Sequence, residues 1–156
     1  MTPSFATQAK EIVDRIDRIA EPSVSDLQHA LVELTRIHNE IMFHLKAASG
    51  ETQERWLTLL KEENPVIDRA MYQIMDLARY CHPGRYLEFA LGVVRSPVLV
   101  GRHQVGEWTE QGNRPLLLSL AMSARRALQV IPTIDRSRLG ELVDALREKG
   151  VDEPCQ

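Results

Sequence analysis

The sequence predicts an all-α fold, a compact multi-helix bundle or globule of about six or seven helices. Three observations support this fold class. Apolar residues recur three and four positions apart along most of the chain, which is the spacing of one helix face. Prolines and glycines divide these stretches into lengths typical of helices. Val98-Leu99-Val100 is a candidate strand, and the sequence offers no second candidate to pair with it.

Two helices are predicted before residue 50. The first runs from about Ser4 or Thr7 to Ala20 and ends before Pro22, because the residue preceding a proline resists helical geometry. Ser25 is the expected N-cap of the second helix, whose apolar stripe is the most regular in the chain. We therefore expect this helix to be the central one of the core. Its stripe comprises Leu27, Leu31, Leu34, His38, Ile41, Leu45 and Ala48.

The next stretch predicts two helices separated at residue 64. Ser49-Gly50 interrupts the pattern, and a short helix is expected over 52–63. Asn64 as N-cap and Pro65 at the first helical position then predict a new helix, which continues to Cys81. The three residues that follow, His82-Pro83-Gly84, are expected to end it.

The C-terminal half predicts up to four further helices, over 83–95, from residue 97 onward, over 115–131, and from 133 or 135 to 149. The second of these is the weakest, because Gly101 and Gly106 would each cost a helix about 1 kcal/mol relative to alanine. Gly150 is the expected C-cap of the last helix. We expect 1–150 to form a single helical domain and 151–156 to be a disordered tail.

Composition bounds the class of protein. Hydrophobic residues make up 44% and charged residues 26% of the 156 positions, which is typical of a soluble globular domain. No apolar run approaches the roughly 18 residues of a membrane span. Two cysteines are too few for a disulfide framework, and the first residues do not resemble a signal peptide. We expect a cytoplasmic protein that needs no membrane and no cofactor.

Residues 79–115 depart from this regular pattern. They hold five of the eight glycines, three of the eight prolines and five arginines without a lysine. Residues that break local structural rules tend to gather at functional or strained sites. Arginine and aromatic side chains also dominate the energetics of protein interfaces. The candidate partner- or anion-binding residues are Arg79, His82, Arg85, Tyr86, Arg95, Arg102, His103 and Trp108.

The leading functional hypothesis is a non-enzymatic interaction or regulatory protein, an adaptor or modulator that binds another protein through 79–115. The sequence contains neither the Gly-x-Ser-x-Gly motif of many hydrolases nor a phosphate-binding Gly-x-x-x-x-Gly-Lys loop. No catalytic residue is therefore assigned. A homodimer is a possible form, because two-fold dimers are the commonest soluble oligomers.

Nucleic-acid binding is the first alternative. Residues 79–138 carry nine arginines against four acids, a balance of +5, whereas residues 1–78 carry 8 basic and 13 acidic side chains, a balance of −5. Arginines pair with phosphate, so a basic face would favour nucleic acid. A continuous basic surface supports this alternative, and interleaved charges argue against it.

A metal-binding bundle is the second alternative. His29 and Glu33, like Glu40 and His44, stand four residues apart on one predicted helix. The segment Ile37-His38-Asn39-Glu40 resembles hemerythrin-like domains, and that resemblance implies a metal site between helices. Such a site needs matching ligands on other helices, and no metal ligand is assigned. Residues 43–49 also resemble the active-site helix of histidine phosphotransfer domains, which implies His44 as a phosphate acceptor, although Leu45 and Lys46 come one position early.

Overall fold

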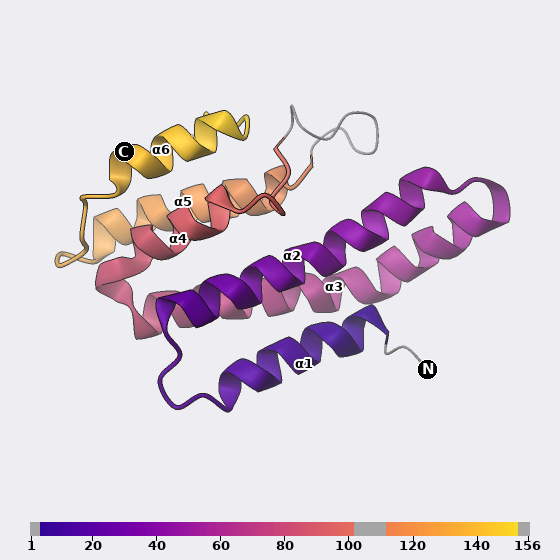
Figure 1. Ribbon diagram of the computed structural model, residues 1–156, viewed down its shortest axis with the longest axis horizontal. Coiled ribbons are helices and arrows are strands. Elements are labelled where there is room, and N and C mark those ends of the chain that lie inside the picture. The colour runs from indigo at the N-terminus through magenta and orange to yellow at the C-terminus, as the bar shows by residue number, and fades with distance from the viewer. Residues whose placement is uncertain (1–3, 102–111, 153–156) are drawn as a thin grey trace.

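The computed structural model describes residues 4–101 and 112–152, and within these ranges it contains helices and loops but no strand (Figure 1). The all-α class is confirmed. No helix in the described ranges is long and apolar enough to cross a membrane. The elements are α1 (Phe5–Asp17), α2 (Val24–Ala47), α3 (Gly50–Cys81), the short 3-10 helix η1 (Pro83–Arg85), α4 (Tyr86–Arg95), α5 (Arg114–Val130) and α6 (Leu139–Glu148).

The first three helices form one bundle. Each of α1, α2 and α3 packs against the other two, and Figure 1 shows α2 running antiparallel to both α1 and α3. The parallel course of α1 and α3 is fixed at both ends. The backbone N–H of Ala6 donates to Glu63 Oε1 over 2.8 Å, and Asp17 lies beside Tyr80 at the other end. Of the apolar stripe predicted for the second helix, Leu27, Leu31, Leu34 and Ile41 are buried, and His38, Leu45 and Ala48 are partly buried.

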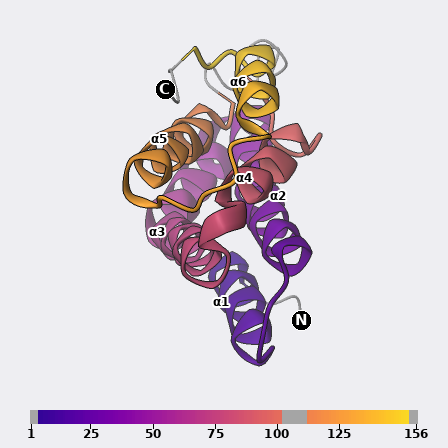
Figure 2. The same ribbon diagram turned by 90° about the vertical axis from the view of Figure 1, so that its left-hand side faces the viewer.

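The most completely buried helix is α4, which packs against α2, α5 and α6 and lies between the bundle and the last two helices (Figure 2). Seven of its 10 residues are buried, and Glu88, Gly92 and Arg95 form the one stripe of the helix that is not. So broad an apolar face places most of this helix inside the core. The second helix, which the sequence predicts to be the central one, packs against α1, α3 and α4, and it shares the core with α4.

The helix α3 passes through Pro65 without interruption, so the prediction of two helices separated at residue 64 is wrong. Proline removes one backbone hydrogen bond and costs a helix interior about 3 kcal/mol. Pro65 itself is exposed, while Ile67 just beyond it is fully buried against the bundle. Packing of both halves of α3 on α2 offsets the local cost. The side chain of Asn64 does not cap a helix, and it bonds instead to His38 of α2 and to Asp68 one turn later in α3.

Residues 97–101 form turns and irregular backbone, so the predicted helix from residue 97 does not form within the described residues. Tertiary contacts explain the difference. The Lys149 ammonium donates to the carbonyl oxygen of Ser96 over 3.1 Å and also to that of Leu99. The Asn39 amide donates to the Val98 carbonyl over 2.8 Å. Side chains from α2 and the end of α6 thus occupy carbonyls that a helix would bond internally.

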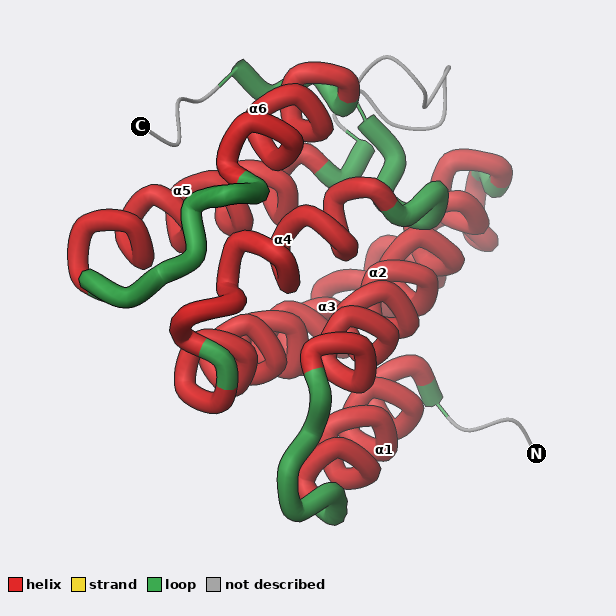
Figure 3. Tube along the Cα trace, turned by 60° about the vertical axis from the view of Figure 1, so that its left-hand side comes forward, coloured by secondary structure: helices red, strands yellow, loops and turns green. Residues whose placement is uncertain are grey.

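The helix ends, where the tube in Figure 3 changes from helix to loop, were predicted with mixed success. The N-cap of α2 is Ser23, not Ser25, because Ser23 and Asp26 form a reciprocal capping box. Gly150 ends α6 with φ +83°, as predicted. The N–H of Val151 donates to the Leu146 carbonyl over 2.9 Å, and Val151 is buried. The structure therefore includes Val151 in the core, although the sequence predicts a tail from this residue.

Candidate functional site

The predicted site residues near the end of α3 lie on the surface but already have partners. Arg79 pairs with Asp76 over 3.3 Å, and Arg85 makes a two-pronged contact with Glu88 at 2.8 and 3.0 Å. This contact raises the pKa of Arg85, first through the hydrogen bond and then through the charge of Glu88. The His82 ring hydrogen-bonds through Nε2 to the Pro22 carbonyl over 2.7 Å, which joins α3 to the α1–α2 loop.

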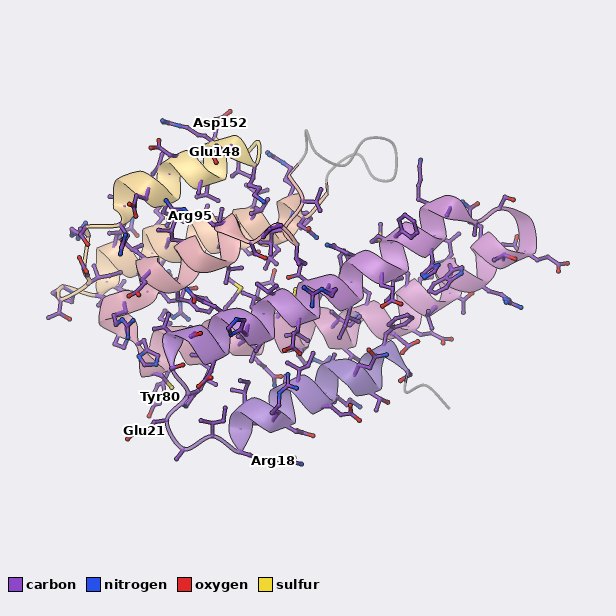
Figure 4. The ribbon with its side chains drawn as sticks, in the orientation of Figure 1. Arg18, Glu21, Tyr80, Arg95, Glu148 and Asp152 are labelled. Atoms are coloured by element: carbon purple, nitrogen blue, oxygen red, sulfur yellow. The ribbon has the colours of Figure 1, made fainter. Side chains whose placement is uncertain are left out.

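The other predicted site residues do not join this group. Tyr86 is 1% exposed, and its hydroxyl hydrogen-bonds with Ser123 over 2.7 Å. Burial is the main cause that raises the pKa of Tyr86. This residue belongs to the core and contributes no partner surface. Arg95 is exposed at the far end of α4, about 15 Å of helix away from Arg85 (Figure 4). Arg102, His103 and Trp108 lie outside the described residues.

The residues on either side of 102–111 are joined to each other by hydrogen bonds. The Val100 N–H donates to Asn113 Oδ1 over 2.7 Å, and the Asn113 N–H donates to the Val100 carbonyl over 2.8 Å. Asn113 Nδ2 also donates to Asn39 Oδ1 over 2.7 Å. Two asparagines from α2 and from the start of α5 therefore fix both ends of this stretch. Asn113 is buried, and its side chain bonds to residues of two other segments.

Charges alternate in sign where η1 meets the start of α6. Arg85 pairs with Glu88 and Arg138 with Glu141, and the charge of Arg138 also helps to lower the pKa of Glu88. The N–H of Asp135 donates to the Gly84 carbonyl over 2.8 Å, which brings the two segments together. In the described part of the basic region, this end therefore presents paired charges and not a continuous basic face.

Two of the side chains predicted as possible metal ligands, Glu33 and His44, have other partners. Glu33 forms an ion pair with Arg15 over 2.7 Å. The His44 ring stacks on Trp56 with centroids 4.6 Å apart and planes 8° apart. No group of three histidine, cysteine or acidic side chains arranged to hold a metal ion occurs in the described residues. The two predicted carboxylate–histidine pairs on α2 are not extended by ligands from neighbouring helices.

A cavity with a volume of about 180 Å³ lies between α2, α3 and the start of α5. His38 Nδ1 hydrogen-bonds to Asn64 Oδ1 over 2.7 Å, and Asn64 Nδ2 donates to Asp68 Oδ2 over 3.2 Å. Because the Asn64 amide nitrogen faces the carboxylate, its oxygen must accept from His38, which places the imidazole hydrogen on Nδ1. Tyr72 lies beside this chain and hydrogen-bonds with Ser119 of α5 over 3.1 Å.

This cavity is suited to recognition. Asp68 is exposed, and partial burial of its carboxylate raises its pKa, while the nearby charge of His38 acts in the opposite direction. The Thr35 hydroxyl, which also lines the cavity, donates to the Leu31 carbonyl over 2.8 Å. The volume is close to that of cavities that hold a benzene-sized group. One side chain or a small molecule is the largest occupant that it admits.

A second feature is the hairpin end of α2 and α3, residues 42–66, which we name the helical arm. The core residues stop at Ile41 and resume at Ile67, so no residue of the arm is fully buried. Figure 1 shows the arm extending beyond the other helices. Phe43 is 58% and Leu57 39% exposed, although both are large and apolar.

Aromatic rings form a row across the helical arm. The edge of Phe43 meets His44 with centroids 5.8 Å apart, His44 stacks on Trp56, and Trp56 meets Phe5 of α1 at 6.0 Å. Sequence reasoning did not single out this row. The feature of the sequence that could have indicated this row is Phe43, which lies outside the regular apolar stripe of its helix. A large aromatic residue off the buried stripe of an amphipathic helix is expected on the surface.

Comparison with known proteins adds no relative from which a function could be transferred. The chain matches no family model, and no match is found among curated proteins or solved structures.

Proposed function

We propose that this protein is a non-enzymatic interaction or regulatory protein, an adaptor or modulator that binds another protein through the helical arm. The observation that carries the proposal is the row of rings on an arm with no fully buried residue. Exposed apolar groups that cluster mark interaction sites more often than single ones do. Aromatic residues are also enriched among the hot spots of interfaces.

The energetics of the helical arm favour a partner. Among the described residues, α1 covers only part of the arm, through Phe5 on Trp56 and Ala6 on Glu63. The rest of the arm gains little hydrophobic stabilisation, and short isolated helices are marginal in water. Burying Phe43 fully would contribute about 1.5 to 3 kcal/mol, and more than half of that side chain is still available. A second protein that covers Phe43 and Leu57 would therefore stabilise the arm and the complex together.

The proposal replaces 79–115 with the helical arm as the principal surface. Among the described residues of 79–115, Arg79 and Arg85 are already paired with carboxylates and Tyr86 is buried. Arg95 is exposed and makes no ion pair with a described residue, so it remains a candidate for a secondary contact. The same pairing of charges gives no support to the nucleic-acid alternative.

Site-specific photocrosslinking tests the proposal. A photoreactive phenylalanine analogue at position 57, in extract from cells that naturally express the chain, is expected to capture a discrete protein. The same analogue at Met122, a still more exposed apolar site on α5, serves as the matched control and should not capture it.

Phe43→Ala, introduced beside the analogue, should reduce capture at position 57 at least tenfold, because a hot-spot aromatic contributes 2 kcal/mol or more (about 1.4 kcal/mol is tenfold in affinity). Unchanged melting would show that the variant is folded. Capture of a second copy of the chain would show that the partner is the same protein and that the chain forms a homodimer through the arm. The proposal fails if Phe43→Ala leaves every adduct at position 57 unchanged.

A further inference from the structure

The outer side of the α1–α3 pair forms a groove that the fold leaves uncovered. Two depressions of about 350 and 300 Å³ adjoin there, and both are lined by Val13, Asp17 and Gln73. The first extends to Tyr80 and the second to Val66. From Val66 to Tyr80 along α3 the groove is about 21 Å long, at a helical rise of about 1.5 Å per residue.

The shape of the groove is that of a seat for a helix. On the inner side of the same pair, α2 packs against both α1 and α3 and runs antiparallel to them. The outer side presents the same two parallel helices, with an apolar lining that includes Val13, Ala70 and Leu77. A helix laid there would repeat the contact that α2 makes inside, and its dipole would oppose those of both neighbours.

The charges along the groove are separated by sign. Lys10 and Arg69 line the end near Val66, and Asp14 and Asp17 follow along α1 toward the other end. In the described structure none of these four side chains takes part in an ion pair; of the ion pairs that do form, the one at the groove joins Asp76 and Arg79. One end of the groove is therefore basic and the other acidic, with charges available to a partner.

Tyr80 marks the acidic end. Its side chain is 86% exposed, the largest exposure among the large apolar residues of the described structure. Figure 4 shows Tyr80 at the end of the bundle where Arg18 and Glu21 also lie. Asp76, one turn earlier on α3, lines the groove as well and is shared with Arg79. An aromatic ring beside carboxylates suits a cationic side chain, which interacts with both.

We infer that this groove binds an amphipathic helix of a partner protein, with lysine or arginine facing Asp14 and Asp17 and with acidic side chains facing Lys10 and Arg69. The inference rests on the proposed protein-binding function and specifies a second surface and the chemistry of its occupant. Helix-in-groove binding uses apolar anchors for affinity. The separated charges fix which end of the helix lies where, as complementary charges do at interfaces.

Binding of synthetic peptides to the full chain tests the inference. The probes are fluorescent helical peptides of about 15 residues, the length of the groove. All share one leucine face. The matched peptide carries lysines at one end and glutamates at the other, a second peptide has glutamates at both ends, and a third has lysines at both ends. Fluorescence anisotropy should show the matched peptide binding the tightest.

The decisive variant is Asp17→Lys, because lysine at the last residue of α1 suits the helix dipole and should not unfold the helix. It should weaken the matched peptide about five- to tenfold and should strengthen the all-glutamate peptide. Asp144→Lys, the same change of charge on an exposed position of α6, is the control and should change neither. High salt should reduce the preference for the matched peptide.

The outcomes separate this inference from the proposed function. Equal binding of the three peptides, or no response to Asp17→Lys, overturns the inference and leaves the helical arm untouched. Self-association of the chain that Asp17→Lys abolishes would also overturn it, because the occupant would then be a second copy. If the arm captures no partner but the peptides behave as expected, the proposed arm surface fails while the groove still binds its helix.

Discussion

Gly101→Ala should destabilise the fold, because a side chain at this position has no space. A β-carbon built on Gly101 would lie 2.6 Å from the carbonyl oxygen, 2.7 Å from the α-carbon and 2.9 Å from the carbonyl carbon of Lys149. All three are backbone atoms at the end of α6, so no rotamer change relieves the contact. The Lys149 ammonium at the same time ties that backbone to the carbonyls of Ser96 and Leu99.

The magnitude follows from two opposing effects. Forcing an extra carbon into a packed site typically costs 1 to 3 kcal/mol. Replacing glycine by alanine also restricts the unfolded chain, which contributes about 0.4 to 1 kcal/mol of stability. A contact of 2.6 Å with fixed backbone favours the upper part of the first range. We therefore expect Gly101→Ala to lower the free energy of unfolding by about 1 to 2 kcal/mol.

Gly140→Ala is the matched control. Gly140 lies in α6, and a β-carbon there would meet no atom within 4 Å. Alanine should stabilise this helix by up to about 1 kcal/mol. Thermal unfolding followed by circular dichroism should show Gly101→Ala melting about 2 to 8 °C lower and Gly140→Ala slightly higher, at about 2 to 4 °C per kcal/mol. A Gly101→Ala protein that melts at or above the wild-type temperature would refute the close approach of the two segments.

Two further predictions concern a helix cap and a carboxylate. Ser23→Ala should lower the free energy of unfolding by about 1 kcal/mol, because it removes half of the capping box with Asp26. Ser25→Ala, the control, should change it little. Equal effects of the two substitutions in urea titrations would contradict Ser23 as the N-cap. Because burial raises the pKa of Asp68 above 3.8, the folded state binds the proton more tightly, so this group's contribution to stability falls as pH rises from 3.8 through the raised pKa. Asp68→Asn keeps an acceptor for the Asn64 amide. The variant should therefore be more stable than wild type at neutral pH and equally stable below about pH 3.8. If the urea midpoints of variant and wild type differ equally at both pH values, the raised pKa of Asp68 is contradicted.

Much of the helix pattern is determined locally and was predictable. The apolar stripe of α2 identifies residues that are buried, such as Leu27 and Leu34, because one face of an amphipathic helix must be covered. Gly150 ends α6 in the left-handed conformation that glycine adopts without strain. Pro115 opens α5 because the first turn of a helix needs no N–H from that residue. These features depend on neighbours in sequence.

The candidate surfaces were not predictable in the same way. The sequence places Tyr86 with Arg85 in one candidate site, yet packing turns the ring into the core and leaves the guanidinium outside. Exposure of Phe43 depends on how the helices pack, because α1 reaches the arm through Phe5 on Trp56 and leaves Phe43 58% exposed. The groove between α1 and α3 arises from two helices whose sequences are about 50 residues apart.

By itself, the sequence determined that this protein is all-α, where most of its helices lie and which stripe of each is buried. It could do so because hydrogen bonding within a helix and the spacing of apolar residues are local properties. Only the tertiary structure decided that α3 continues through Pro65, that seven of the 10 residues of α4 are buried and that Gly101 meets Lys149. Each depends on a balance in which packing against distant segments outweighs a local preference of a few kcal/mol.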